Sequence, residues 1–303
     1  MSGANSFGSR FIVTSFGESH GTALGVVIDG VPAGLKWNDS LLHSELERRR
    51  PGQSKFVTAR SESDTPEILS GVFEGKTLGT PIAMIVRNSD ARSEDYRKIA
   101  KTPRAGHADD VWKDKFGHSD PRGGGRSSGR ETVSRVMAGA VAKMLLQKQS
   151  PKIRFTGFAR TIGEFEVSAA DLKKLAKSKA KYPADEFSLR FPSAKDGKRA
   201  ENLLLKAKEK GLSYGGIVEL WIDGLPKGLG QPVFHKLKSD LAAAFMSVGA
   251  TIGVEFGEGF ASTKAEGSKF HRSKEDVYGG IRGGVSTGER IVARVAFKPT
   301  SWP

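Results

Sequence analysis

The chain has 303 residues, of which 37% are hydrophobic, with a formal net charge of +14 and no cysteine. This length fits one large domain or two closely packed ones, since a single hydrophobic core stops growing near about 250–300 residues. The lack of cysteine excludes disulfides, thiolate metal sites and thiol nucleophiles. No apolar signal segment opens the sequence, and no stretch reaches the ~20 apolar residues of a membrane helix, so we predict a cytoplasmic protein without membrane contact.

The positive charge favours an anionic partner, which can be a nucleic acid, an acidic membrane surface or a small polyanion. Much of the excess lies in a lysine-rich run, which we interpret as part of a variable basic surface segment at residues 165–198. The run contains Lys173, Lys174, Lys177, Lys179 and Lys181. The arginines that stand next to glycines and histidines carry the chemical argument instead.

The first half of the chain predicts strands, one helix and a long polar stretch. Strands rich in Val and Ile are expected at residues 11–14, 23–29, 68–73 and 82–86. A helix is expected at residues 38–50, with Asn38 or Ser40 as its cap and Pro51 and Gly52 after its end. Residues 89–125 are polar without a clear period, and loops of that length are usually functional.

The second half opens with the best helix pattern of the sequence, which follows residue 131. Seven apolar residues recur at helical spacing there: Val133, Val136, Met137, Ala140, Val141, Met144 and Leu145. Ser128 and Glu131 form a capping-box pattern before them. Further strands are expected at residues 155–159, 216–223 and 290–298, and further helices at 200–210 and 237–246.

Two segments of the sequence resemble each other. Residues 26–34 read VVIDGVPAG and residues 218–228 read VELWIDGLPKG. Each is a strand followed by Asp-Gly, an aliphatic residue, Pro, one residue and Gly. A duplicated α/β unit explains the likeness, and so does the independent use of the same turn sequence at two places. The predicted fold class is α/β.

The strongest chemical signal is RGGGRSSGR at residues 122–130. Glycines allow close backbone approach to a ligand, a helix N-terminus offers N–H donors, and arginines bind phosphate through two parallel hydrogen bonds. The segment therefore predicts an anion site, and the spacing is not that of a Walker A loop. The alternative is a mobile glycine loop with capping serines.

Two histidines stand in segments that suit acid–base chemistry. His20 lies in GESHG between two predicted strands, and His107 lies in PRAGHADD at residues 103–110. The carboxylates after His107 lack the i, i+4 ligand spacing of a metal site, so we predict no metal. We interpret the other histidines as surface residues: His43, His118, His235 and His271. A second glycine-dense turn, at residues 279–288, precedes the strand that leads to Lys298.

These segments together resemble chorismate synthases. FGESHG, RRRPGQS, GHAD, RGGGRSSGRET, GLPKGLGQPVF, GVEFGEGF, GGVSTGE and FKPTS occur in the family's order, from about residue 3 to residue 301. The resemblance implies a single catalytic domain at residues 1–303 with a β-α-β sandwich fold. Residues 171–198 have no match in it.

The resemblance implies a lyase of the shikimate pathway of aromatic amino acid biosynthesis. It would remove phosphate from 5-enolpyruvylshikimate 3-phosphate by 1,4-anti elimination, giving chorismate. Reduced FMN is the implied cofactor, and NADPH is its implied reductant, either directly or through a separate flavin reductase. The family also implies a homotetramer, and no nucleic acid partner.

Site residues follow by matching motifs. His20 resembles the acid near the departing phosphate, His107 the residue that protonates reduced flavin, and Ser19 and Ser128 the supporting hydroxyls. The substrate anions would be bound by Arg49, Arg104 and Arg130. The flavin would contact Arg126, Ser127, Ser128, Gly249, Ala250, Gly283, Lys298, Pro299, Thr300 and Ser301. NADPH would contact Arg49 and Lys55.

Some features depart from the family pattern. Lys55 stands where the family has an arginine, which keeps the charge but loses the fork geometry. The family continues past KPTS to an Arg-His-Asp-Pro motif, so we expect a C-terminally incomplete chain. One alternative is therefore a catalytically impaired member that binds FMN or substrate. The other is a basic RNA-binding protein, which the sparse aromatic residues argue against.

Overall fold

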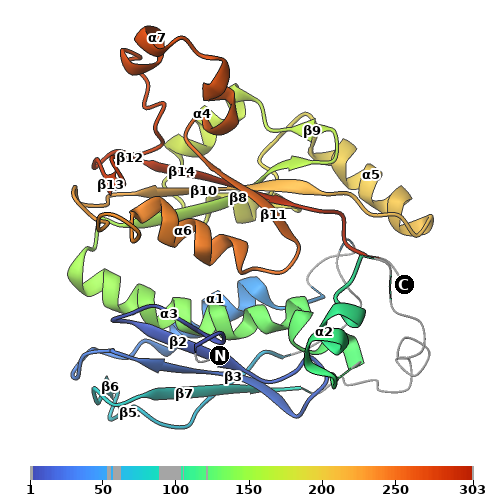
Figure 1. The fold of residues 1–303 in the computed structure, drawn as a ribbon, viewed down its shortest axis with the longest axis vertical. Coiled ribbons are helices and arrows are strands. Elements are labelled where there is room, and N and C mark those ends of the chain that lie inside the picture. Colours follow the sequence, from blue (N-terminus) through green and yellow to red (C-terminus); the bar gives the residue numbers. More distant parts are fainter. Residues whose placement is uncertain are drawn as a thin grey trace. The chain divides into compact units, whose positions relative to one another are not determined.

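The computed structural model describes residues 3–52, 56, 63–88, 104, 106–120 and 122–301. The chain divides into two compact units, residues 1–149 and residues 150–302. Each unit contains a five-stranded antiparallel sheet together with helices (Figure 1). This confirms the predicted mixed α/β class.

The sheet of the first unit has the strand order β1-β2-β3-β7-β4, and β5 and β6 form a separate hairpin. The strands are β1 (Ser6–Phe7), β2 (Ile12–Phe16), β3 (Ala23–Asp29), β4 (Pro66–Ile68), β5 (Val72–Phe73), β6 (Lys76–Thr77) and β7 (Ile82–Arg87). The helices are α1 (Asp39–Arg49), α2 (Asp109–Phe116) and α3 (Thr132–Gln149), with 3₁₀ helices η2 (Arg122–Ser127) and η3 (Gly129–Glu131).

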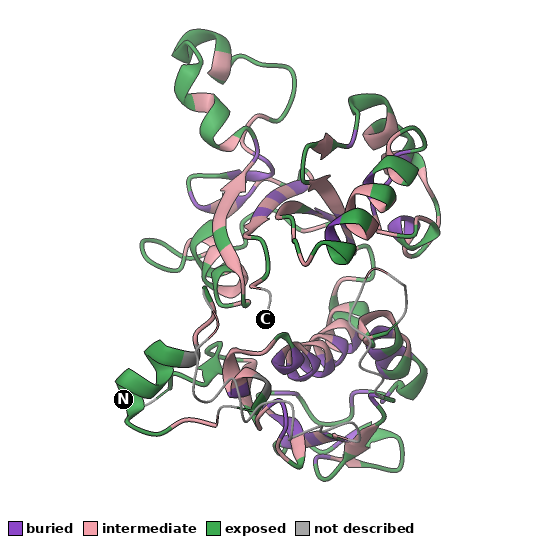
Figure 2. Cartoon of the chain, turned by 90° about the vertical axis from the view of Figure 1, so that its right-hand side faces the viewer, coloured by how far each residue is buried: buried purple, intermediate pink, exposed green. Residues whose placement is uncertain are grey.

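The core of the first unit lies between its sheet and α3. Alternate residues of β3 face it because strand side chains alternate between faces, and Val26 pairs with Met84 of β7. Val133, Met137 and Val141 of α3 are fully buried against them, which confirms the predicted apolar stripe. Each such side chain stabilises the fold by roughly 1.5–3 kcal/mol. Figure 2 shows that buried positions follow the helices and strands of this unit.

The sheet of the second unit has the order β11-β14-β10-β8-β9, and β12 and β13 form a hairpin. The strands are β8 (Arg154–Ile162), β9 (Phe165–Glu166), β10 (Gly216–Asp223), β11 (Thr251–Phe256), β12 (Ile281–Arg282), β13 (Val285–Ser286) and β14 (Ile291–Phe297). The helices are α4 (Ala169–Lys177), α5 (Gly197–Glu209), α6 (Leu237–Met246) and α7 (Gly267–His271), with η4 (Pro183–Glu186) and η5 (Gly259–Lys264).

The two units repeat one topology. The first runs through β2, β3, α1, the edge strand β4, the hairpin β5–β6 and β7. The second runs through β8, β10, α6, the edge strand β11, the hairpin β12–β13 and β14. In both, the two similar sequence segments form the middle strand and the turn after it. The likeness between these segments therefore reflects a repeated structural unit as well as a shared turn.

Several expectations need correction. The strand expected at residues 68–73 is split into β4 and β5, because Gly71 between them has a φ of +82°. In the polar stretch 89–125, residues 89–103, 105 and 121 lie outside the described residues, and the remainder holds α2 and the beginning of η2. Strand β11 was not expected.

The basic segment at residues 165–198 contains α4, whose N-terminus is capped by Ser168. Leu175 of α4 is buried in a cluster with Phe158 and Trp221, while the five lysines of the run are exposed. Within the described part of the chain, the structure has no helix long and apolar enough to cross a membrane.

Candidate functional site

The turn between β2 and β3 carries Ser19 and His20, which are buried to 1% and 7% exposure. The Ser19 N–H donates to the carbonyl of Gly125 at 3.2 Å, which joins this turn to the glycine-rich segment. The Asn88 amide, directly after β7, donates to the Gly21 carbonyl at 2.8 Å and more weakly to that of Glu18 at 3.4 Å. One backbone hydrogen bond to Gly125 and the side-chain amide of Asn88 thus fix the turn that carries His20.

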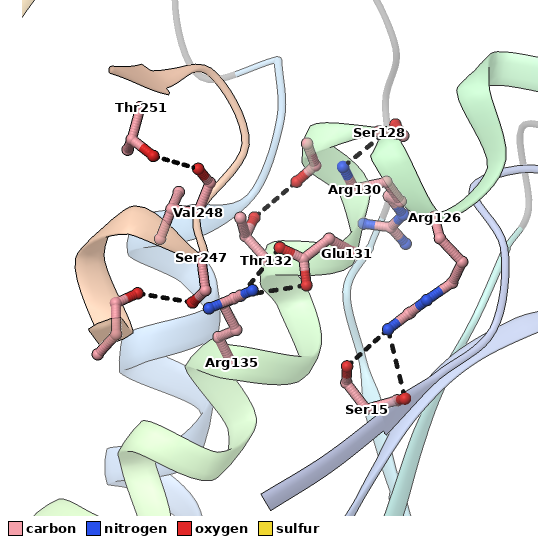
Figure 3. A network of polar contacts seen from close by, with 12 residues as sticks. Ser15, Arg126, Ser128, Arg130, Glu131, Thr132, Arg135, Ser247, Val248 and Thr251 are labelled. Carbon is pink, nitrogen blue, oxygen red and sulfur yellow. Dashed lines mark hydrogen bonds and ion pairs between the residues drawn. The ribbon is translucent and has the colours of Figure 1, made fainter. Parts of the chain in front are cut away.

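The glycine-rich segment folds as two consecutive 3₁₀ helices before α3 begins (Figure 3). Ser128 accepts from the Arg130 N–H at 3.3 Å and so caps η3 rather than α3. Glu131 accepts from Arg135 Nε at 2.9 Å, one turn along α3. The expected capping box is therefore wrong: Ser128 acts as a cap, but for η3, and α3 starts at Thr132, after the 3₁₀ turns.

Arg126 ties this segment to the end of β2. Its Nη1 donates to the Gly17 carbonyl at 2.9 Å. Its Nη2 donates to the hydroxyl of Ser15 at 2.6 Å, as Figure 3 shows. The Ser127 hydroxyl donates to the Gly124 carbonyl at 2.7 Å. Two side chains expected at the flavin are thus also engaged in shaping the loop.

His107 packs on the same segment. A Cβ added to Gly124, whose φ is +80°, would lie 2.5 Å from Cε1 of His107, so only glycine fits beneath the ring. Arg104 Nη2 lies 3.2 Å from both ring nitrogens of His107. The structure therefore brings His107 and Arg104 to Gly124, next to the residue that holds the turn of His20.

Arg49 and Arg130 meet at a residue that the sequence interpretation did not select, Asp64. Arg49 Nη1 lies 2.9 Å from Asp64 Oδ2, and Arg130 Nη1 contacts Asp64 Oδ1. Arg130 Nε also donates to Asn88 Oδ1 at 3.2 Å, which connects Arg130 to the turn of His20. Asp64 belongs to no motif of the sequence, and nothing in the pattern around it signals a buried carboxylate.

Asp120 adds a carboxylate near His20. Both of its oxygens accept from Arg122 at 2.8 Å. Hydrogen bonding to Arg122 is the main cause that lowers the pKa of Asp120, and the charge of the nearby His20 acts in the same direction. The carboxylate is therefore ionised at neutral pH and favours a positive charge in its surroundings.

The candidates of the second unit fall into two groups. Lys298, after β14, donates its backbone N–H to the Ala250 carbonyl at 3.0 Å, so residues 249–250 and 298–301 lie together. Gly283 lies in the β12–β13 turn, beside the opposite end of β14. The seven-residue strand between them spans about 23 Å, so this unit does not bring Gly283 and Lys298 together.

Some candidates fall outside these groups. Lys55 lies outside the described residues. His43, His118, His235 and His271 are exposed, which agrees with the surface interpretation. In the described ranges, no three His, Asp or Glu side chains gather as a metal site would require.

Comparison with known proteins identifies the family. A family model described as chorismate synthase matches residues 11–302. A chorismate synthase of Bdellovibrio bacteriovorus is 58% identical over 301 residues, covering 98% of this chain and 87% of that protein. One of Methanosarcina mazei is 45% identical over 306 residues, covering 98% and 82%.

A crystal structure of a chorismate synthase matches with a TM-score of 0.76 and 32% identity, covering 95% of this chain and 84% of that one. The matches span nearly the whole chain and join the motifs of both units. The chain belongs to the chorismate synthase family.

Proposed function

We propose that this protein is a lyase that removes phosphate from 5-enolpyruvylshikimate 3-phosphate by 1,4-anti elimination and releases chorismate, with reduced FMN as cofactor. The observation that carries the proposal is the connected set of cationic and acid–base side chains in the first unit. His20, His107 and Arg104 all lie against Gly124 and Gly125 or the turn bonded to them. Such a set suits a small substrate with several negative charges.

Each side chain has a role in this proposal. His20 would hold a proton for the departing phosphate, because it is buried in a fixed turn and lies near the ionised Asp120. Arg49, Arg104 and Arg130 would bind the carboxylates and phosphate of the substrate. Ser19 and Ser128 would support the same site through their hydroxyl groups.

The residues present fit a flavin. In the first unit, the arginine, the serine hydroxyls and the close-approach glycines of residues 124–128 are donors that suit a phosphate or a polar ring edge. In the second unit, a Cβ at Gly283 would meet no atom within 4 Å, so its backbone is open to a ligand. Ala250 has a φ of +68°, and a non-glycine residue in that region is a frequent mark of a functional site.

Reduced flavin supplies transient electron donation that helps phosphate to leave. We propose Arg126, Ser127 and Ser128 in the first unit, and Gly249, Ala250 and residues 298–301 in the second, as its contacts. Gly283 matches the same cofactor by its motif, but strand β14 separates it from Lys298, so the two would contact one flavin only from different copies of the chain. His107 would exchange a proton with it through a ring nitrogen. Arg49 and Lys55 are the proposed contacts for NADPH. The homotetramer, a separate flavin reductase and the cytoplasmic location are carried into the proposal with the family.

An anaerobic assay tests the proposal. The purified chain is mixed with photoreduced FMN and 5-enolpyruvylshikimate 3-phosphate, and chorismate and phosphate are measured. We expect both products in equal amounts, only with reduced flavin, and tighter FMN binding when substrate is present. Equal turnover without flavin would refute the cofactor role. Tight substrate binding with no chorismate would instead identify an impaired family member.

A further inference from the structure

Asp64 occupies a buried position between two arginines. Its side chain is 1% exposed, and those of Arg130 and Arg49 are 3% and 16% exposed. Each carboxylate oxygen binds a different arginine, Oδ1 that of Arg130 and Oδ2 that of Arg49. One carboxylate therefore sets how far apart the two guanidinium groups lie and how they are turned.

The other contacts of the two arginines hold the same arrangement. Arg49 Nε donates to the Thr132 hydroxyl, and its Nη2 to the Gly129 carbonyl, each at 3.2 Å. The side chains of Asp64, Arg49 and Arg130 together carry two positive charges and one negative charge, so the sum over these three described residues is positive where solvent is largely excluded. Such a charge attracts an anion more strongly than it would in water.

The backbone of Asp64 is also unusual, because its φ is +48°. A non-glycine residue in the left-handed region costs roughly 1–2 kcal/mol, and aspartate tolerates it better than most residues. Strain of this kind persists where surrounding contacts determine the conformation, and it concentrates at functional sites. The two ion pairs are such contacts.

We propose that Asp64 is a positioning residue that fixes the spacing and orientation of Arg49 and Arg130 for the anionic groups of the substrate. This inference rests on the proposed function. The substrate carries two carboxylates and a phosphate, and a guanidinium recognises such groups through two parallel hydrogen bonds that need correct alignment. A displacement of about 1 Å at such a contact can cost roughly 10²-fold in rate.

A second explanation is that Asp64 only neutralises charge. The two explanations predict opposite results for Asp64→Asn. If neutralisation is the only role of Asp64, removing its negative charge leaves the two arginines more attractive to an anionic substrate, so the variant binds substrate more tightly. If Asp64 positions the arginines, both ion pairs are lost, the amide Nδ2 faces a guanidinium donor in place of one hydrogen bond, and substrate binds more weakly. Asparagine also tolerates the left-handed backbone, so the variant keeps the local conformation.

Asp64→Glu gives an independent comparison. It keeps the charge but moves the carboxylate by about one C–C bond, roughly 1.5 Å. Neutralisation predicts a variant like the wild type, whereas positioning predicts impaired binding. The matched control is Asp223→Asn in the second unit, where Asp223 binds Arg290 through both oxygens at 2.7 and 3.2 Å.

The experiment measures the dissociation constant of 5-enolpyruvylshikimate 3-phosphate by calorimetry, together with kcat and KM under reducing conditions. Melting curves show which variants are folded. We expect the dissociation constant and KM to rise at least tenfold in Asp64→Asn and Asp64→Glu, and to stay within twofold of wild type in Asp223→Asn.

Tighter binding by Asp64→Asn, or Asp64→Glu within twofold of wild type, would overturn the inference and leave the proposed function standing. If neither Asp64 variant folds, the residue is structural and the positioning role is refuted. Wild-type protein that does not bind the substrate would refute the proposed function, and this inference with it.

Discussion

Asn88 links Arg130 to the turn that carries His20, and its two ends can be tested separately. Its Oδ1 accepts from Arg130 Nε at 3.2 Å, while its Nδ2 donates to the Gly21 carbonyl at 2.8 Å. The partners fix the orientation of the amide, because Nε–H can only donate and a carbonyl can only accept. Asn88→Asp keeps the contact with Arg130 and places a carboxylate oxygen against the carbonyl.

The expected cost follows from these contacts. A neutral hydrogen bond contributes about 1 kcal/mol, and a buried polar atom left against the wrong partner costs about 1–3 kcal/mol. In Asn88→Asp, a stronger ion pair with Arg130 offsets part of this loss of stability. It does not replace the lost hydrogen bond to Gly21, so the turn that carries His20 stays misplaced. If the displaced turn raises the activation free energy by about 1.4–2.8 kcal/mol, kcat should fall by roughly 10- to 100-fold.

The assay compares kcat for Asn88→Asp with that for Asn38→Asp under reducing conditions. Asn38 caps α1 by accepting from the Leu41 N–H at 3.0 Å, and aspartate accepts there equally well. The control should therefore match the wild type in rate and melting temperature. Wild-type kcat in a folded Asn88→Asp variant would refute the view that this amide positions His20.

Three further predictions concern single side chains. His20→Ala and His107→Ala should each lose roughly 10²–10⁴-fold in kcat with unchanged melting curves, while His43→Ala, exposed on α1, should keep its rate. Glu219→Gln should destabilise the second unit by about 3 kcal/mol in urea unfolding, because buried Glu219 binds Trp221 and Arg294. Burial alone would lower the pKa of Arg294, but its hydrogen bonds to Glu219 and Glu255 raise that pKa. Glu219→Gln removes one of the two carboxylates and should therefore make the rise in the pKa of Arg294 smaller. Asp120→Asn should lower the free energy of unfolding by about 0.5 kcal/mol at pH 7, because solvent screens the ion pair with Arg122. Because the pKa of Asp120 is lowered in the folded state, this difference should be present above about pH 4 and vanish as the pH falls further.

Elements with a strong apolar period could be predicted from the sequence. Strand β10 and helix α6 have the expected bounds, and β3, α1 and β14 differ from theirs by at most one residue at each end. These patterns succeed because the side chains that face a core repeat at the period of the backbone. The family, and with it the α/β class, followed from the order of the motifs.

The elements that were missed lack such a period. Helix α2 has no side-chain cap at Ala108, and Val111, Trp112 and Phe116 on it are exposed, so neither a start signal nor an apolar stripe marks it. In α4 the lysines conceal the single buried Leu175. Asp64 was missed for a different reason: its partners are 15 and 66 residues away, and only the folded chain brings them together.

The repeated topology can be tested at the Asp-Gly turns of the two units. Gly30 and Gly224 have φ values of +80° and +75°. A Cβ added to them would lie 1.6 Å from the Arg10 carbonyl oxygen and 2.2 Å from that of Lys152, just before the neighbouring strand in each unit. Alanine at either position therefore combines left-handed strain with a backbone collision, and we expect a cost of roughly 2–5 kcal/mol.

The second glycine of each turn is the matched control. Gly34 and Gly228 also have positive φ values, of +74° and +86°, but a Cβ there would meet nothing within 4 Å. Alanine at these positions should cost only the backbone strain, about 1–2 kcal/mol. Hydrogen exchange read by mass spectrometry can assign each loss to β2–β3 or to β8–β10. If the four variants do not sort into these two pairs, the turns do not play equivalent parts in the two units, and the likeness of their sequences has another origin.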